Sequence, residues 1–241
     1  MPGLRSRVGV YAGAMESTVS EVWPAPRVEL PRGPHGLPRD VVERSQRSRL
    51  EVALVDAVAE KGYVATTVAD IIARAGVSRT TFYQQFKDKE DCFLQAYRHG
   101  ATAQLRRVVE AVESASDPLE QLRRNIRAYL AALVEYPACA RAFLLEVAAA
   151  GPRALALKGE IELRYVELFQ RLHARFRERH PGLPELPVEA FRAAVAAVDD
   201  MVVRRVLEGK LAELAELEPV ALYVELALFG LPSLEVLPPQ P

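Results

Sequence analysis

One segment, residues 66–90, constrains the fold of this chain more than any other: TTVADIIARAGVSRTTFYQQFKDKE. It predicts a short helix, a tight turn and a second short helix. Thr67 is a favourable N-cap residue for the first helix, and Ser78 is one for the second. Gly76 supplies the left-handed residue that ends the first helix. The apolar residues of the first helix recur at helical spacing and are Val68, Ile71, Ile72 and Ala75.

The second short helix has two contrasting faces. Phe82 and Phe86 are its large apolar residues, and they lie four positions apart on one face. The opposite face carries hydrogen-bonding side chains, which are Arg79, Thr80, Tyr83 and Gln84. A short helix anchored on one side, polar on the other and set at an angle by a three-residue turn is the form that enters a DNA major groove.

The same residues resemble the DNA-binding signature of the TetR family of transcriptional regulators, roughly T-T-x-x-x-I-A-x-x-A-G-V-S-x-G-T-x-Y-x-H-F-x-x-K-E. The resemblance extends back through residues 47–50 and 60–63, and the rest of the chain matches only as an all-helical shape. Three positions depart from the pattern: Ile72 replaces the usual Ala, Thr80 a common Gly and Gln85 a common His. The base preference of relatives therefore does not transfer to this chain.

The resemblance implies a cytoplasmic, homodimeric, all-α regulator that binds a double-stranded DNA operator as a repressor and is released by a small-molecule effector. Arg79 and Thr80 are expected to meet base edges, with Gln84 as a further reader. The remaining predicted DNA-binding residues are Thr67, Thr81, Tyr83 and Lys89, all placed for phosphates, together with Ser78 and Gln85. Lys89 also lies at a helix N-terminus, where backbone amides favour the same anion. An activator, a regulator without a diffusible effector, and an all-helical enzyme or scaffold are the alternatives.

Charge and composition exclude several other classes. Lys plus Arg number 31 against 32 Asp plus Glu, so affinity for DNA must come from well-placed charges and not from a general positive field. The two cysteines, Cys92 and Cys139, form no CxxC pair, which favours a reducing compartment over a disulfide scaffold. His173 and His180 would lie about 10.5 Å apart along a helix, too far to share a metal ion. No phosphate loop, HExxH or GxSxG element is present, so we expect no catalytic site, metal or cofactor.

The pattern of Pro, Gly and apolar residues predicts four regions. Residues 1–38 are a Pro-rich flexible extension, within which Met15 is an alternative start, and residues 232–241 are a Pro-rich tail. Residues 30–39 resemble an arm that contacts DNA in some relatives, although a solvated linker is the favoured interpretation. Residues 39–90 form the helix-turn-helix domain and residues 91–231 a helical bundle for ligand binding and dimerisation. Helices are expected at about 40–61, 88–112, 117–136, 139–149, 151–180, 187–208 and 219–229, without strands and without a membrane-spanning run.

The last two predicted helices carry an apolar repeat flanked by alanines, which favours a four-helix dimer interface over simple closure of the monomer core. The residues of this predicted interface are Phe191, Val195, Val198, Val202, Val206, Leu222 and Leu226.

A ligand cavity is expected among the middle helices, lined by side chains that combine apolar area with polar tips. Its predicted residues are Tyr129, Tyr136, Phe143, Tyr165, Phe169 and His173. The pair Asp199–Asp200 interrupts an apolar stretch; it could pair with Arg204 or Arg205 across the interface, face water, or meet a cationic ligand.

Overall fold

The computed structural model describes residues 38–231, and this part of the chain is helical without a strand. The two ends, 1–37 and 232–241, lie outside the described residues, and with them the predicted extension, the alternative start at Met15, most of the predicted arm, and the tail. The helices are α2 (Arg39–Lys61), α3 (Val68–Ala75), α4 (Arg79–Gln85), α5 (Lys89–Glu113), α6 (Pro118–Glu135), α7 (Pro137–Ala140), the π-helical turn η1 (Arg141–Leu145), α8 (Pro152–Arg179), α9 (Val188–Leu207), the 3₁₀ segment η2 (Leu211–Leu217) and α10 (Glu218–Leu228).

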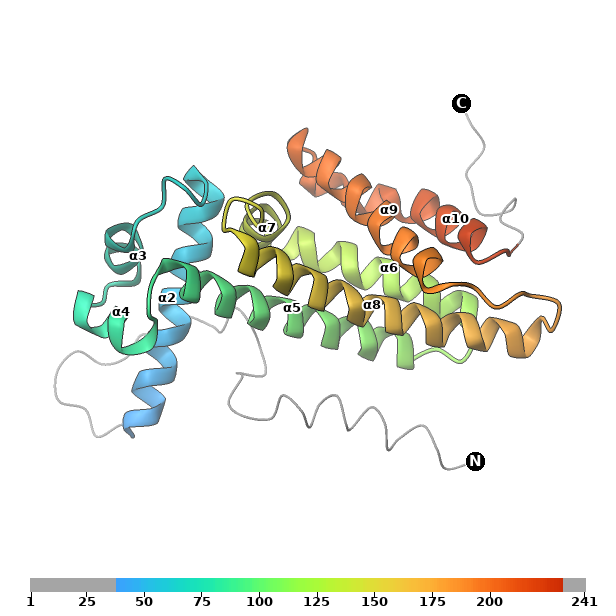
Figure 1. Cartoon of the computed structure of the whole chain (residues 1–241), viewed down its shortest axis with the longest axis horizontal. Helices are drawn as coiled ribbons and strands as arrows, with labels where there is room; N and C mark the ends of the chain where they lie inside the picture. The colour runs from blue at the N-terminus through green and yellow to red at the C-terminus, as the bar shows by residue number, and fades with distance from the viewer. Residues whose placement is uncertain (1–37, 232–241) are drawn as a thin grey trace.

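The molecule is elongated, with α2, α3 and α4 gathered at one end (Figure 1). From that end α5 runs along the length of the bundle, where it contacts both α6 and α8. The last helices, α9 and α10, pack against each other and lie along one side of the bundle, α9 on α8 and α10 on α6. The all-α class and the division into a helix-turn-helix end and a helical bundle, predicted from the sequence, are confirmed.

Local sequence signals place most helix ends. Asp117 accepts a hydrogen bond from the Glu120 amide at 3.0 Å and Pro118 occupies the first turn, so α6 starts where the sequence predicts. Gly62 ends α2 with φ 83°, a conformation that favours glycine. The helix expected from about residue 40, with Asp40 as its N-cap, begins instead at Arg39; Pro38 is the N-cap and Asp40 lies in the first turn, where an acidic side chain is favourable.

The segment after α6 differs from the single helix expected at 139–149. Pro137 begins the short helix α7, which continues into the π-helical turn η1 and then into turns as far as residue 150. In this segment Phe143 packs against two rings of α5, with centroids 5.6 Å from Phe93 and 4.7 Å from Tyr97. The 3₁₀ segment η2 was also not expected; its buried residues Leu214 and Leu217 close one end of the bundle.

Two apolar cores run through the described residues. One is built by α6, α8, α9, α10 and the second half of α5. The other joins the helix-turn-helix end to residues far along the chain, so that Leu54, Ile71 and Phe82 share a core with Phe143 and Leu157. The helix-turn-helix end therefore has no core that is separate from the rest of the protein. Within residues 38–231 no single helix is long and apolar enough to cross a membrane, although the bent pair Pro118–Glu135 and Pro137–Leu145 passes that test jointly.

Candidate nucleic-acid interface and ligand cavity

The helix-turn-helix is held together by its caps and by two phenylalanines. Thr67 caps α3, accepting from the Asp70 amide at 3.2 Å, while Asp70 accepts from the Thr67 amide at 2.8 Å. Gly76 adopts the left-handed conformation with φ 64°, and the Ser78 hydroxyl accepts from the Thr81 amide at 3.0 Å to cap α4. Phe82 and Phe86 are buried beneath α4, as their spacing predicts.

The opposite face of α4 is exposed to solvent. Arg79, Thr80, Tyr83 and Gln84 are exposed, and Tyr83 keeps 52 % of its surface accessible although it is aromatic. Thr81 and Gln85 are half-buried at the edges of this face. The residues predicted to read bases thus share one accessible surface, and their contacts with DNA stay predictions.

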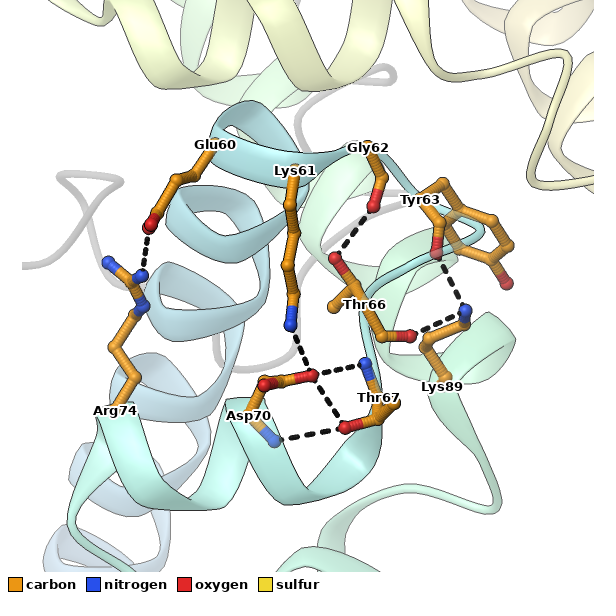
Figure 2. Close-up of polar contacts among 9 residues, drawn as sticks. All are labelled: Glu60, Lys61, Gly62, Tyr63, Thr66, Thr67, Asp70, Arg74 and Lys89. Atoms are coloured by element: carbon orange, nitrogen blue, oxygen red, sulfur yellow. Dashed lines mark hydrogen bonds and ion pairs between the residues drawn. The ribbon is translucent and has the colours of Figure 1, made fainter.

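Ion pairs fix α3 against the end of α2 (Figure 2). Lys61 Nζ lies 2.5 Å from Asp70 Oδ2, and Arg74 pairs with Glu60. The hydrogen bond from Lys61, followed by those from Thr67, holds the pKa of Asp70 well below its usual range. These two ion pairs join the end of α2 to α3 beside the apolar core that the same helices share.

Lys89 does not reach outward as the phosphate contact predicted from the sequence requires. Its ammonium donates to the carbonyl oxygens of Tyr63 at 2.7 Å and Thr66 at 2.8 Å, and it lies 4.1 Å from the centroid of the Tyr63 ring (Figure 2). Burial lowers the pKa of Lys89. The ammonium of Lys89 therefore binds the loop between α2 and α3, and a contact of this residue with DNA stays a prediction.

Three contacts at this end of the protein were not anticipated. Arg47 donates to the Gln85 carbonyl at 3.0 Å, with its guanidinium 5.2 Å from the Phe86 centroid, and so closes the end of α4. The Tyr63 amide donates to Glu146 Oε2 at 2.8 Å, which ties the loop after α2 to the segment after η1. The buried Glu51 lies 2.9 Å from His99 Nδ1 and links α2 to α5. For Arg47 a signal existed, because it belongs to the segment 47–50 that carries the resemblance; Glu146 had none.

A cavity of about 120 Å³ lies among α5, α6, α8, α9 and α10. Four of the predicted ligand residues line it, namely Tyr129, Tyr136, Phe143 and Tyr165. The prediction is wrong for Phe169 and His173. These two pack with Phe229 in a separate aromatic cluster, with ring centroids 5.7 Å and 5.6 Å from it, because α8 continues past the end of the cavity.

The acidic pair in α9 divides between two environments. Asp199 lines the cavity, where it accepts from the Tyr129 hydroxyl at 2.7 Å and from Lys158 Nζ at 3.0 Å. Asp200 pairs with Arg204 of the same helix at 2.7 Å on the surface. Burial, together with the charge of Asp199, raises the pKa of Tyr129 well above its usual value, so the hydroxyl stays protonated as a donor.

The apolar repeat predicted to form a dimer interface faces the interior of the protomer. Its buried members are Phe191, Val198, Val202, Val206, Leu222 and Leu226, and the half-buried Val195 lines the cavity. The alternative interpretation, closure of the monomer core, is therefore correct for these side chains. A different stripe of α9 is left on the outside, with residues spaced by three and four: Ala193, Ala196, Asp200, Val203 and Leu207.

In this protein the second helix of a helix-turn-helix has an exposed polar face. This arrangement is typical of helix-turn-helix DNA-binding proteins. The family model described as "Bacterial regulatory proteins, tetR family" matches residues 53–96. The HTH-type transcriptional activator FasR of Mycolicibacterium smegmatis is 29 % identical over 93 residues, 39 % of this chain, and the chain spans 41 % of that relative's length.

Solved structures show the same fold. The fatty acid degradation regulator FadR of Bacillus halodurans superposes with a TM-score of 0.67 at 21 % identity, over 73 % of this chain and 94 % of that one. The transcriptional regulator FadR of Bacillus subtilis, solved in complex with stearoyl-CoA, gives a TM-score of 0.67 at 22 % identity, over 73 % and 96 % of the two chains. The family model thus matches the helix-turn-helix end of the chain, and the likeness to the solved structures shows that the fold extends through the helical bundle.

Proposed function

We propose that this protein regulates transcription by placing α4 in the major groove of a DNA operator. The observation that carries the proposal is the outer face of α4, where Arg79, Thr80, Tyr83 and Gln84 are exposed above the buried Phe82. Arg79 is the first residue of the helix, and the first turn of a recognition helix is the part that contacts base edges. Such a regulator acts in the cytoplasm, where the chromosome lies, and needs no catalytic group.

The protein acts as a homodimer, because two recognition helices reach successive half-sites about 34–36 Å apart on one side of the DNA. The surface that supports this proposal is the outer stripe of α9 (residues 193, 196, 200, 203 and 207) together with Val220 and Ala227 of α10. Leu207 is 68 % exposed there, and the alanines allow close approach of a second helix. A two-fold arrangement would bring the same stripe from each protomer together.

A small, mostly apolar effector bound in the cavity alters the spacing of the two recognition helices and so weakens DNA binding. Two features support this route. Tyr97 and Phe143 line the cavity and also belong to the core shared with the helix-turn-helix end. Three residues beyond Phe143, Glu146 accepts the hydrogen bond from Tyr63, whose carbonyl in turn binds Lys89. Repression released by the effector is the simplest outcome of this coupling. Activation is the second candidate, because the similar protein FasR is described as a transcriptional activator.

Selection from a random DNA pool tests the proposal directly. The full-length protein should enrich a two-fold symmetric sequence, and the Arg79→Ala variant should lose most of that enrichment. Gln95→Ala, in α5 and away from the face of α4, serves as the matched control and should enrich the same sequence. Equal retention of all sequences by the wild-type protein would rule out operator recognition. Placing the selected operator before a reporter gene, with and without the regulator, then separates repression from activation.

A further inference from the structure

Glu225 is a buried carboxyl group in the wall of the cavity. It belongs to α10, keeps only 1 % of its surface exposed, and its Oε2 atom has no hydrogen-bond partner within the described part of the chain. Buried polar atoms in folded proteins are nearly always paired, since an unpaired one costs about 1–3 kcal/mol of stability. A leucine of similar volume at this position would avoid that cost.

Two other residues of the same wall share this property. The Tyr165 hydroxyl of α8 and the Gln104 Nε2 of α5 are also buried and have no hydrogen-bond partner among residues 38–231. Gln104 Nε2 is a donor only, and a tyrosine hydroxyl can donate. Burial raises the pKa of Glu225 well above its usual value and so favours the neutral carboxyl, whose hydroxyl adds a third donor. Three helices thus bring unused hydrogen-bond donors to one apolar cavity.

The charged groups around the cavity are paired with one another. Lys158 is held between Asp199 and Glu162, and Arg107 binds Glu135 Oε2 at 2.6 Å. A charged ligand would therefore meet no unpaired counter-charge, and burying its charge would be costly. An uncharged ligand with an acceptor oxygen matches the unused donors without disturbing these pairs.

The size of the cavity limits the apolar part of the ligand. Its volume of about 120 Å³ is somewhat below the roughly 150 Å³ of an engineered apolar cavity that binds benzene. We propose that the cavity binds an uncharged molecule with a ring-sized apolar body and a carbonyl oxygen, and that Glu225 donates the hydrogen bond to that oxygen. This inference deepens the proposed function, on which it rests in taking the cavity as the effector site.

Three probes with equal numbers of heavy atoms separate the alternatives: cyclohexanone carries a carbonyl, toluene is apolar and cyclohexylammonium is a cation. In titrations of the full-length protein, cyclohexanone should bind roughly five- to tenfold more tightly than toluene, as one net hydrogen bond provides, and cyclohexylammonium should bind most weakly. Glu225→Gln should keep the preference for the ketone, because the amide is still a donor. Glu225→Leu should abolish this preference and raise the melting temperature.

Gln121→Leu is the matched control. Gln121 is buried and its Oε1 has no partner in the part of the chain that the structure describes, but it does not line the cavity, so its substitution should leave the ketone preference unchanged. The inference would be overturned by any of four results: equal binding of ketone and toluene, tightest binding of the ammonium, a ketone preference that survives Glu225→Leu, or no binding of any probe because the cavity holds only water. DNA selection with the same preparations separates the two proposals. If the protein recognises an operator but shows no ketone preference, only the proposed ligand is refuted. If it prefers the ketone but recognises no operator, only the proposed regulatory function is refuted.

Discussion

Removing the ammonium of Lys89 distinguishes the role that the structure gives this residue from the phosphate contact predicted by its sequence. Lys89→Met keeps the apolar stem but deletes the hydrogen bonds to the carbonyls of Tyr63 and Thr66, at 2.7 and 2.8 Å, and the contact with the Tyr63 ring. A hydrogen bond to a charged group contributes about 1.5–3 kcal/mol and an exposed cation–π contact about 0.5–1 kcal/mol. Desolvation of the ammonium offsets part of this, so we expect a loss of about 2–4 kcal/mol in the free energy of unfolding.

Urea denaturation measures that loss, and DNA titrations at several salt concentrations measure the second consequence. A loosened loop before α3 should weaken binding to every DNA sequence while the slope of log affinity against log salt stays unchanged. Loss of a phosphate contact would instead reduce that slope by about one for each protomer. Lys87→Met, at an exposed position two residues earlier, is the control and should leave the stability unchanged. Unchanged stability with a reduced salt slope for Lys89→Met would refute the structural assignment.

Three further predictions follow from the recognition helix, the outer stripe of α9 and the cavity. Arg79→Ala should lose about 1–3 kcal/mol on the preferred operator and relax discrimination at one base pair per half-site, measured with mismatched operators; equal losses on all sequences would show a backbone contact instead. Ala196→Arg should give folded monomers in sedimentation, whereas Val198→Arg should unfold the protomer because Val198 is buried; a dimeric Ala196→Arg variant would exclude the outer stripe. The stabilisation by Glu225→Leu should grow as the pH rises above about 4.5. Because folding raises the pKa of Glu225, the folded protein holds the carboxyl proton more tightly than the unfolded chain does. The stability that this proton contributes to the wild-type protein is fully present below the unfolded pKa and is lost as the pH rises towards the folded pKa. A pH-independent difference in denaturation profiles would contradict the buried, protonated state.

Much of the fold could be predicted from the sequence because the signals are local. The caps at Thr67, Ser78 and Asp117 and the four-residue spacing of Phe82 and Phe86 depend only on neighbours along the chain. These signals determine where helices begin and which face is apolar.

What could not be predicted depends on partners that are distant in sequence. Spacing shows that Val198 and Val202 share a face, but whether that face meets the same protomer or another one is decided by the packing of α9 on α8 and α10. Similarly, Tyr165 and Phe169 share a face of α8, but the cavity ends between them. Tyr165 lines the cavity, whereas Phe169 packs against Phe229. Lys89 was located by similarity, yet its partners lie in a loop more than twenty residues earlier.

The core that crosses from the helix-turn-helix end into the bundle limits how this protein can be engineered. Synthetic regulators are often assembled as chimeras, in which one DNA-reading head is joined to the sensor of another protein. Here a junction directly after α4 would separate Tyr63 from Phe93, whose rings are 5.2 Å apart, and from Glu146. A functional graft would have to take the first half of α5 and residues 138–157 together with the head, since Phe93, Tyr97, Phe143 and Leu157 all belong to its core. The exchangeable unit of this protein is thus discontinuous in sequence.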